Sequence, residues 1–216
     1  MRRKSLTVVA AAVLGVLTAA PAFADSMFSL YFGSYAPHSD ATSRGTNDTF
    51  VRDAAAGESL DMSAFKHYIV GFDGLNRAGE HVEISLGAGF YNQSVDGSYG
   101  GLTVTNKLML APASATVRYL PLALDARVHP YFGGGVAVTY WRLGYEDFAG
   151  SESDMGFAVG PLFVLGVRAP VADTISIGGE MRWQGGHGTT STDGFFQGST
   201  VDVGGRTLMV TVSFGR

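Results

Sequence analysis

Hydrophobic and polar residues alternate one by one along most of the chain after residue 25. The segment 81–91, HVEISLGAGFY, is a clear case: its hydrophobic face carries Val82, Ile84, Leu86, Ala88 and Phe90. The residues between them are Glu83, Ser85, Gly87, Gly89 and Tyr91, which are mostly small or polar. Because successive side chains of a β-strand point to opposite faces, this period of two predicts a strand with one hydrophobic face.

The same alternation recurs in eight segments, most of them about 8–12 residues long, the length that a tilted strand needs to cross a bilayer. The segments are 28–35, 67–73, 81–91, 107–120, 128–141, 156–168, 176–184 and 206–216. Pro112 interrupts the fourth segment, where we expect a bend or a bulge. No stretch of comparable length shows helical periodicity, and no apolar run after the N-terminal region approaches the roughly 20 residues of a membrane-spanning helix.

The connections between these segments alternate between long and short. The long ones are residues 36–65, 92–105, 143–155 and 185–205, and the short ones are residues 74–80, 121–127 and 169–174. Transmembrane barrels have short periplasmic turns and long external loops, whereas a soluble β-sandwich, the alternative, does not require this regularity. The sequence therefore predicts an all-β fold, an eight-stranded antiparallel up-and-down transmembrane β-barrel.

An eight-stranded barrel has an interior just wide enough to be filled by side chains. The faces assigned to this interior carry the charged residues Glu83, Arg118, Glu180 and Arg182, with Arg168 as a further candidate. An unpaired charge in a narrow lumen is costly, so we expect these residues to form pairs of opposite charge across the barrel. Glycines on the same faces would make room for larger side chains.

The N-terminal region predicts export. Arg2, Arg3 and Lys4 precede a hydrophobic stretch, and Ala22-Phe23-Ala24 forms a small-x-small cleavage site, so residues 1–24 are predicted to be a signal peptide rather than a membrane anchor. The barrel domain would then cover residues 25–216. That portion has 12 basic and 19 acidic residues, which argues against nucleic-acid binding. The chain has no cysteine, which excludes disulfides and cysteine-based metal sites.

Three segments carry a family resemblance: HPYFGGGVAVTY (129–140), IGGEMRW (177–183) and LMVTVSF (208–214). They resemble strands of the small eight-stranded outer-membrane β-barrel proteins of Gram-negative bacteria, the OmpA/OmpX type. The resemblance implies a location in the outer membrane, contact with its lipid and lipopolysaccharide, and insertion by the barrel assembly machinery. It also implies a monomer. The family usually ends on the aromatic residue, whereas Gly215 and Arg216 follow Phe214 here.

No motif points to catalysis, a metal or a cofactor, and we predict no site of these kinds. The run Gly133–Gly135 lacks the Lys-Ser/Thr of a phosphate-binding loop and lies in a predicted strand. The histidines, His38, His67, His81, His129 and His187, have no metal-ligand spacing and are interpreted as solvated or interfacial residues. Acidic residues gather in the first and third long connections, which suits a solvated loop, divalent-ion bridging to lipopolysaccharide, or adhesion to a basic partner.

Three functions remain open. The first is a non-enzymatic role in the outer membrane, structural or surface-binding through the long external loops. The second is a narrow, porin-like channel for small or hydrophobic molecules, as OmpW-like barrels are thought to form. The third is a lipid A-modifying enzyme, although the His-x-Ser-Asn segment of lipid A deacylases is absent.

Overall fold

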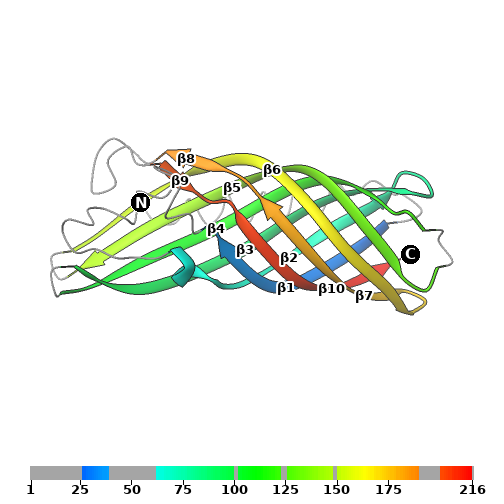
Figure 1. Ribbon diagram of the computed structural model, residues 1–216, viewed down its shortest axis with the longest axis horizontal. Helices are drawn as coiled ribbons and strands as arrows, with labels where there is room; N and C mark the ends of the chain where they lie inside the picture. The colour runs from blue at the N-terminus through cyan, green and yellow to red at the C-terminus, as the bar shows by residue number, and fades with distance from the viewer. Residues whose placement is uncertain are drawn as a thin grey trace.

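The computed structural model describes residues 26–38, 62–99, 102–122, 126–147, 150–189 and 200–215, and the predicted signal peptide lies outside them. Eight long strands form a barrel, shown in Figure 1. They are β1 (Ser26–Pro37), β2 (His67–Arg77), β3 (Val82–Tyr99), β4 (Leu102–Tyr119), β5 (His129–Asp147), β6 (Gly150–Ala172), β7 (Ile175–Gln184) and β10 (Gly205–Gly215). The predicted fold class is confirmed.

Every neighbouring pair in the ring is antiparallel, in the order β5-β4-β3-β2-β1-β10-β7-β6, and the pairing of β5 with β6 closes it. Following the register once around the ring from Gly166 of β6 returns to the same strand at Gly156, ten residues earlier. At ordinary strand spacings this displacement corresponds to a strand tilt of roughly 42°. The closed ring leaves no free strand edge, so the backbone groups of the wall can pair between neighbouring strands, as a bilayer requires.

Four strands are much longer than the sequence predicted. β3 and β4 have 18 residues each, β5 has 19 and β6 has 23. The prediction of loops at 92–105 and 143–155 is wrong, because β3 stays paired with β4 up to Tyr99 and Leu102, and β5 stays paired with β6 up to Asp147 and Gly150. The residues of these extensions are mostly polar and therefore lack the hydrophobic alternation that predicted the other strands. Outside a membrane the outward face of a sheet can be polar. In Figure 1 the green-to-yellow strands accordingly extend farther to the left than β1 and β10.

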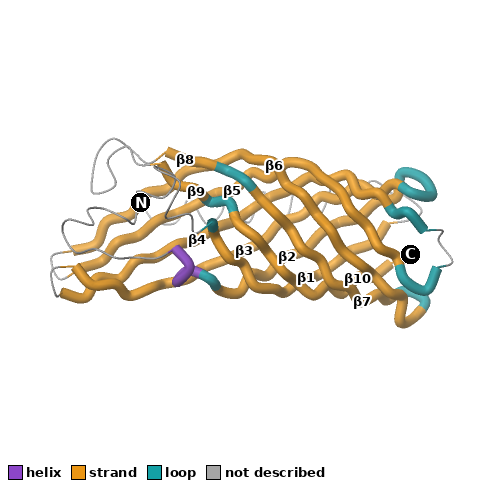
Figure 2. The backbone as a smooth tube through the Cα atoms, viewed as in Figure 1, coloured by secondary structure: helices purple, strands orange, loops and turns teal. Residues whose placement is uncertain are grey.

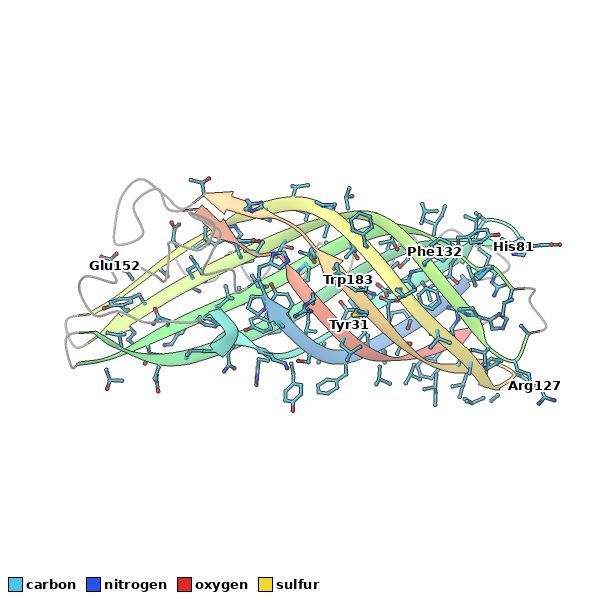
Figure 3. The ribbon with its side chains drawn as sticks, viewed as in Figure 1. Tyr31, His81, Arg127, Phe132, Glu152 and Trp183 are labelled. Carbon is cyan, nitrogen blue, oxygen red and sulfur yellow. The ribbon has the colours of Figure 1, made fainter. Side chains whose placement is uncertain are left out.

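Two short strands, β8 (His187–Thr189) and β9 (Thr200–Asp202), continue the wall beyond β7 and β10. The 3-10 helix η2 (Met62–Phe65), purple in Figure 2, packs against β1 and β3. Among the described residues no helix combines the length and the apolarity needed to cross a membrane. The short turns lie at the end of the barrel opposite β8 and β9. Figure 3 labels His81 and Arg127 at this end, far from Glu152 of β6.

The assignment of inward and outward faces is confirmed for every strand. The outward residues Leu208 and Phe163 are 65% and 60% exposed, whereas the inward Glu83 and Arg118 are 1% and 2% exposed. Outward aromatic rings pair between neighbouring strands near both limits of the apolar wall. The ring pairs are Phe28–Phe72, Phe32–Tyr68, Tyr119–Phe132 and Tyr140–Phe157, with centroids 5.1–5.7 Å apart. Such aromatic girdles are typical of transmembrane barrels.

Pro112 neither ends β4 nor produces a bulge. The pairs of β3 with β4 stop at Ala113 and resume at Leu110, but the register is the same on both sides of the gap. On its other edge Pro112 pairs with Thr139 of β5. Proline lacks an N–H, so it removes a ladder hydrogen bond on one edge without changing the register. The expected bulge is therefore wrong.

The triple glycine of β5 serves the packing of the wall. A Cβ placed on Gly133 or Gly135 would overlap the backbone oxygen of Val117 or Ala115 in β4. The two inward glycines therefore allow β4 and β5 to coil closely against each other, and they do not make room for a neighbouring side chain as expected. Gly166 does make such room, because a Cβ there would overlap the ring of Tyr131.

These positions give a matched pair of substitutions. We expect Gly135→Ala to destabilise the barrel by about 1–3 kcal/mol, because the new methyl group must push the β4 backbone away. Gly134→Ala, one residue earlier, faces outward with its nearest atom at 3.5 Å and should be nearly neutral. Urea titrations in detergent micelles, read as the loss of heat-modifiable gel migration, compare the two variants. Equal stability of both would contradict the steric account.

Candidate functional site

Six charged side chains meet in the half of the lumen nearer the short turns. We call this set the lumen charge network: Asp73 (β2), Glu83 (β3), Arg118 (β4), Arg168 (β6), Glu180 and Arg182 (β7). All six are buried, and their formal charges cancel. The period of two places each of them inward, and the closure of the ring then brings strands from opposite sides of the barrel within reach of one another.

Arg118 occupies the centre of the network. Its guanidinium nitrogens lie 3.1 Å from Oδ2 of Asp73, 3.3 Å from Oε2 of Glu180 and 3.7 Å from Oε1 of Glu83. Glu83 is also the direct cross-strand neighbour of Arg118, whereas Glu180 lies on β7, which is not adjacent to β4. The contact between Arg118 and Glu180 therefore spans the lumen.

The other two arginines complete the crossing. Arg168 donates from Nη2 to Oε2 of Glu83 at 2.9 Å. Arg182 donates to both Asp73 and Glu180, which joins β7 to β2 across the lumen. With every carboxylate contacting at least one guanidinium, the buried charges are mutually compensated, which is the condition under which buried ions are tolerated.

Two tyrosines fix the arginines in place. The hydroxyl of Tyr131 donates to Oε2 of Glu180 at 2.7 Å, and its ring lies 5.2 Å from Arg118 and 5.8 Å from Arg168. Arg182 lies 4.7 Å above the ring of Tyr31. At these distances the cations interact favourably with the ring faces. The arginine side chains are therefore fixed by contacts with tyrosines of the barrel wall and have little freedom to move out of the lumen.

A layer of buried hydrophobic side chains fills the lumen on the other side of the network. We call it the apolar cluster: Tyr31, Tyr35, Phe65, Ile69, Tyr91, Val104, Leu108, Leu110, Trp141, Leu143, Tyr145, Ala158, Val203 and Met209. Phe65 comes from η2, and its carbonyl oxygen accepts a hydrogen bond from the hydroxyl of Tyr91. Trp141 is fully buried and lies against Gly156 and Gly188, where a Cβ would overlap its indole. The small helix thus contributes to the filling of the barrel.

A cavity of about 20 Å³ lies where the two layers meet. Its lining includes Arg182 from the lumen charge network and Tyr31, Ile69 and Met209 from the apolar cluster, together with Leu162 and Gln184. This volume suits about one water molecule. This cavity is too small for a solute larger than water.

The structure brings the four predicted residues, Glu83, Arg118, Glu180 and Arg182, into direct contact and adds two more. Arg168 was only a further candidate, and Asp73 was missed. The alternation in HYIVGFD already placed Asp73 inward, so its charge on an interior face was the available signal. Its partner Arg182 is 109 residues away in the chain, which no local pattern could connect.

The histidines were interpreted as solvated or interfacial residues, but His129 is buried, and Nδ1 of His81 lies 2.7 Å from the carbonyl oxygen of Leu120. Nδ1 of His38 lies 3.1 Å from Oδ2 of Asp202, and Nε2 of His187 lies 3.7 Å from the same oxygen. The other carboxylate oxygen of Asp202 accepts a hydrogen bond from the N–H of Gly204 at 2.7 Å. These contacts join the end of β1 to β8 and β9, on the side of the barrel far from the short turns. No group of three or more potential metal ligands was found within the described ranges.

The two acidic connections, which were expected to be long loops, are described only in part. The first, with Asp40 to Asp61, lies outside the described residues. Of the third, Glu146, Glu152 and Asp154 lie on β5 and β6, and Glu146 forms an ion pair with Lys107 of β4. These charges therefore stand on a paired sheet, and one of them is compensated across the strand.

No family model and no curated protein matches the sequence. Solved structures do match, over most of the chain. The outer membrane protein OprG from Pseudomonas aeruginosa is 15% identical, with a TM-score of 0.60, and the match covers 89% of this chain and 95% of that one. Neisserial surface protein A is 12% identical, with a TM-score of 0.55 and coverages of 88% and 96%. A major outer membrane protein from Thermus thermophilus is 13% identical, with a TM-score of 0.52 and coverages of 88% and 98%. The chain therefore has the fold of the small eight-stranded outer-membrane β-barrel proteins.

Proposed function

We propose that this protein is a non-enzymatic β-barrel of the Gram-negative outer membrane whose lumen does not conduct. The observation that carries the proposal is the filling of the lumen at two successive levels, by the lumen charge network and by the apolar cluster. An ion entering this path would have to displace paired guanidinium and carboxylate groups and then cross a layer of aromatic and aliphatic side chains. Both steps are strongly unfavourable.

The long ends of β3, β4, β5 and β6 support a surface-binding role. They carry paired strands beyond the apolar wall, so the described residues of these two hairpins form a sheet there. A rigid sheet loses less conformational entropy on binding than a loop does. We place the binding surface on this sheet, with the barrel inserted by the barrel assembly machinery and acting as a monomer.

Planar-bilayer recording of the purified, refolded protein tests the sealed lumen. We expect no reproducible unitary conductance steps, with folding verified by heat-modifiable migration of the same protein preparation. A porin in the same bilayer provides the positive control. Reproducible steps from the wild-type protein would instead favour the narrow-channel hypothesis and would overturn this proposal.

A further inference from the structure

Two cations stand on the outer wall of the barrel, directly above its apolar surface. Arg206 follows the outward residues Phe214, Val212, Val210 and Leu208 along β10, and it is exposed. Lys66 follows Phe72, Val70 and Tyr68 beyond the end of β2, and it is exposed as well. Each is therefore the first charged residue beyond the apolar surface of its strand, where the hydrocarbon region of the bilayer would give way to the lipid head groups.

The register of β1 brings these cations close to each other. Ala36 of β1 pairs with Arg206 of β10, and Tyr35 pairs with His67 of β2. The ladder between β1 and β2 ends at this pair, and Lys66 is the next residue. The same register continued by one residue would set Lys66 opposite Ala36, with only a methyl group between the two cations. Their Cα atoms are then two strand spacings apart, about 10 Å. Both side chains are long enough to reach a common ligand.

Neither cation is neutralised within the described part of the chain. The ion pairs found there involve neither Lys66 nor Arg206, and the outward faces of β1, β2, β7 and β10 carry no acidic side chain. On the opposite wall, Lys107 differs in this respect. Lys107 is paired with Glu146, and Arg142 donates to Oγ of Ser153 at 3.2 Å. Among the described residues, Lys66 and Arg206 therefore stand together without an acidic partner on their side of the barrel.

The apolar wall is also shorter on that side. On β10 the outward hydrophobic run covers residues 208–214, whereas on β6 it covers residues 157–167. With the tilt given above, these runs span about 17 Å and about 26 Å along the barrel axis. A bilayer adjusts to a short hydrophobic surface by local thinning, which would bring head groups down toward Arg206. Trp183, the cross-strand neighbour of Arg206, is of a residue type that favours this interface.

We propose that Lys66 and Arg206 bind the phosphate groups of a phosphorylated lipid in the outer leaflet, with lipid A as the ligand. Lipid A carries a phosphate at each end of a disaccharide, and its acyl chains would lie on the exposed Leu208, Phe32 and Tyr68 below the cations. Charge-assisted bonds from guanidinium and ammonium groups suit phosphate oxygens. The continuity of the cations with a lipid-facing wall favours a lipid over a soluble anion. The inference rests on the proposed membrane location.

Native mass spectrometry of the refolded protein with added lipid A tests the site. We expect the double variant Lys66→Gln/Arg206→Gln to bind bisphosphorylated lipid A about thirtyfold more weakly than the wild type, since each basic side chain near a lipid surface contributes roughly fivefold. The matched control is Lys107→Gln/Arg142→Gln, which removes the same charge on the opposite wall and should bind as the wild type does. Equal binding by the Lys66/Arg206 variant and the wild type would overturn the inference.

Two further arms identify the ligand class. Dephosphorylated lipid A should bind the wild type as weakly as bisphosphorylated lipid A binds the Lys66/Arg206 variant, and inorganic phosphate should not displace the lipid. Tight binding of the dephosphorylated lipid, or displacement by phosphate, would contradict a lipid-phosphate site. Heat-modifiable migration reports folding of each variant. A wild-type protein that fails to insert into vesicles contradicts the membrane proposal itself, whereas insertion without selective lipid A binding contradicts this inference alone.

Discussion

Replacing Arg118 with alanine is expected to lower the free energy of unfolding of the barrel by about 3–5 kcal/mol. The reason is that Arg118 contacts all three carboxylates of the lumen charge network. Its removal leaves a net negative charge buried in a narrow lumen, with Asp73, Glu83 and Glu180 competing for the two remaining arginines. Urea titration in detergent micelles, read by heat-modifiable gel migration, measures the loss.

Two comparisons make this prediction specific. Lys107→Ala breaks an ion pair whose side chains are about half exposed, and it should cost less than about 1 kcal/mol. Adding Glu180→Gln to Arg118→Ala removes one of the uncompensated charges, so the double variant should be less destabilised than the sum of the two single variants. Strictly additive losses, or a loss no larger than that of Lys107→Ala, would show that the network is not coupled as described.

Trp141→Ala should destabilise the barrel by a similar amount, about 3–5 kcal/mol. Trp141 is fully buried in the apolar cluster and packs against Gly156 and Gly188. These glycines have no side chains that could move into the space left by the indole, so a cavity should remain. The same urea titration measures this loss without depending on tryptophan fluorescence.

Phe163→Ala is the control for this second prediction. Its ring is 60% exposed on the outer face of β6, where acyl chains can fill the space that the substitution leaves. We therefore expect a much smaller loss than for Trp141→Ala. If both variants lost the same stability, the apolar cluster would contribute no more than the lipid-facing surface does, and its description as a packed core would be wrong.

Strand identity and facing could be predicted from the sequence because both depend on local alternation. HVEISLGAGFY and RTLMVTVSFGR show which side chains meet lipid, since a bilayer requires an apolar residue at every second position. The same requirement placed Glu83, Arg118, Glu180 and Arg182 inside the barrel. Outside the bilayer the outward residues need not be apolar. The sequence of 92–105 therefore did not indicate that β3 and β4 continue into this segment.

The sequence by itself determined that this is a barrel, which faces its strands present and that charges lie in its interior. Only the tertiary structure decided which charges meet, because the register displacement of the closed ring sets which residues of β2, β4 and β7 share one level. It also decided the partners of His38 and His187, and it placed Arg206 opposite Ala36. Alternation specifies the face of a side chain, but its neighbours across the barrel depend on how the ring closes.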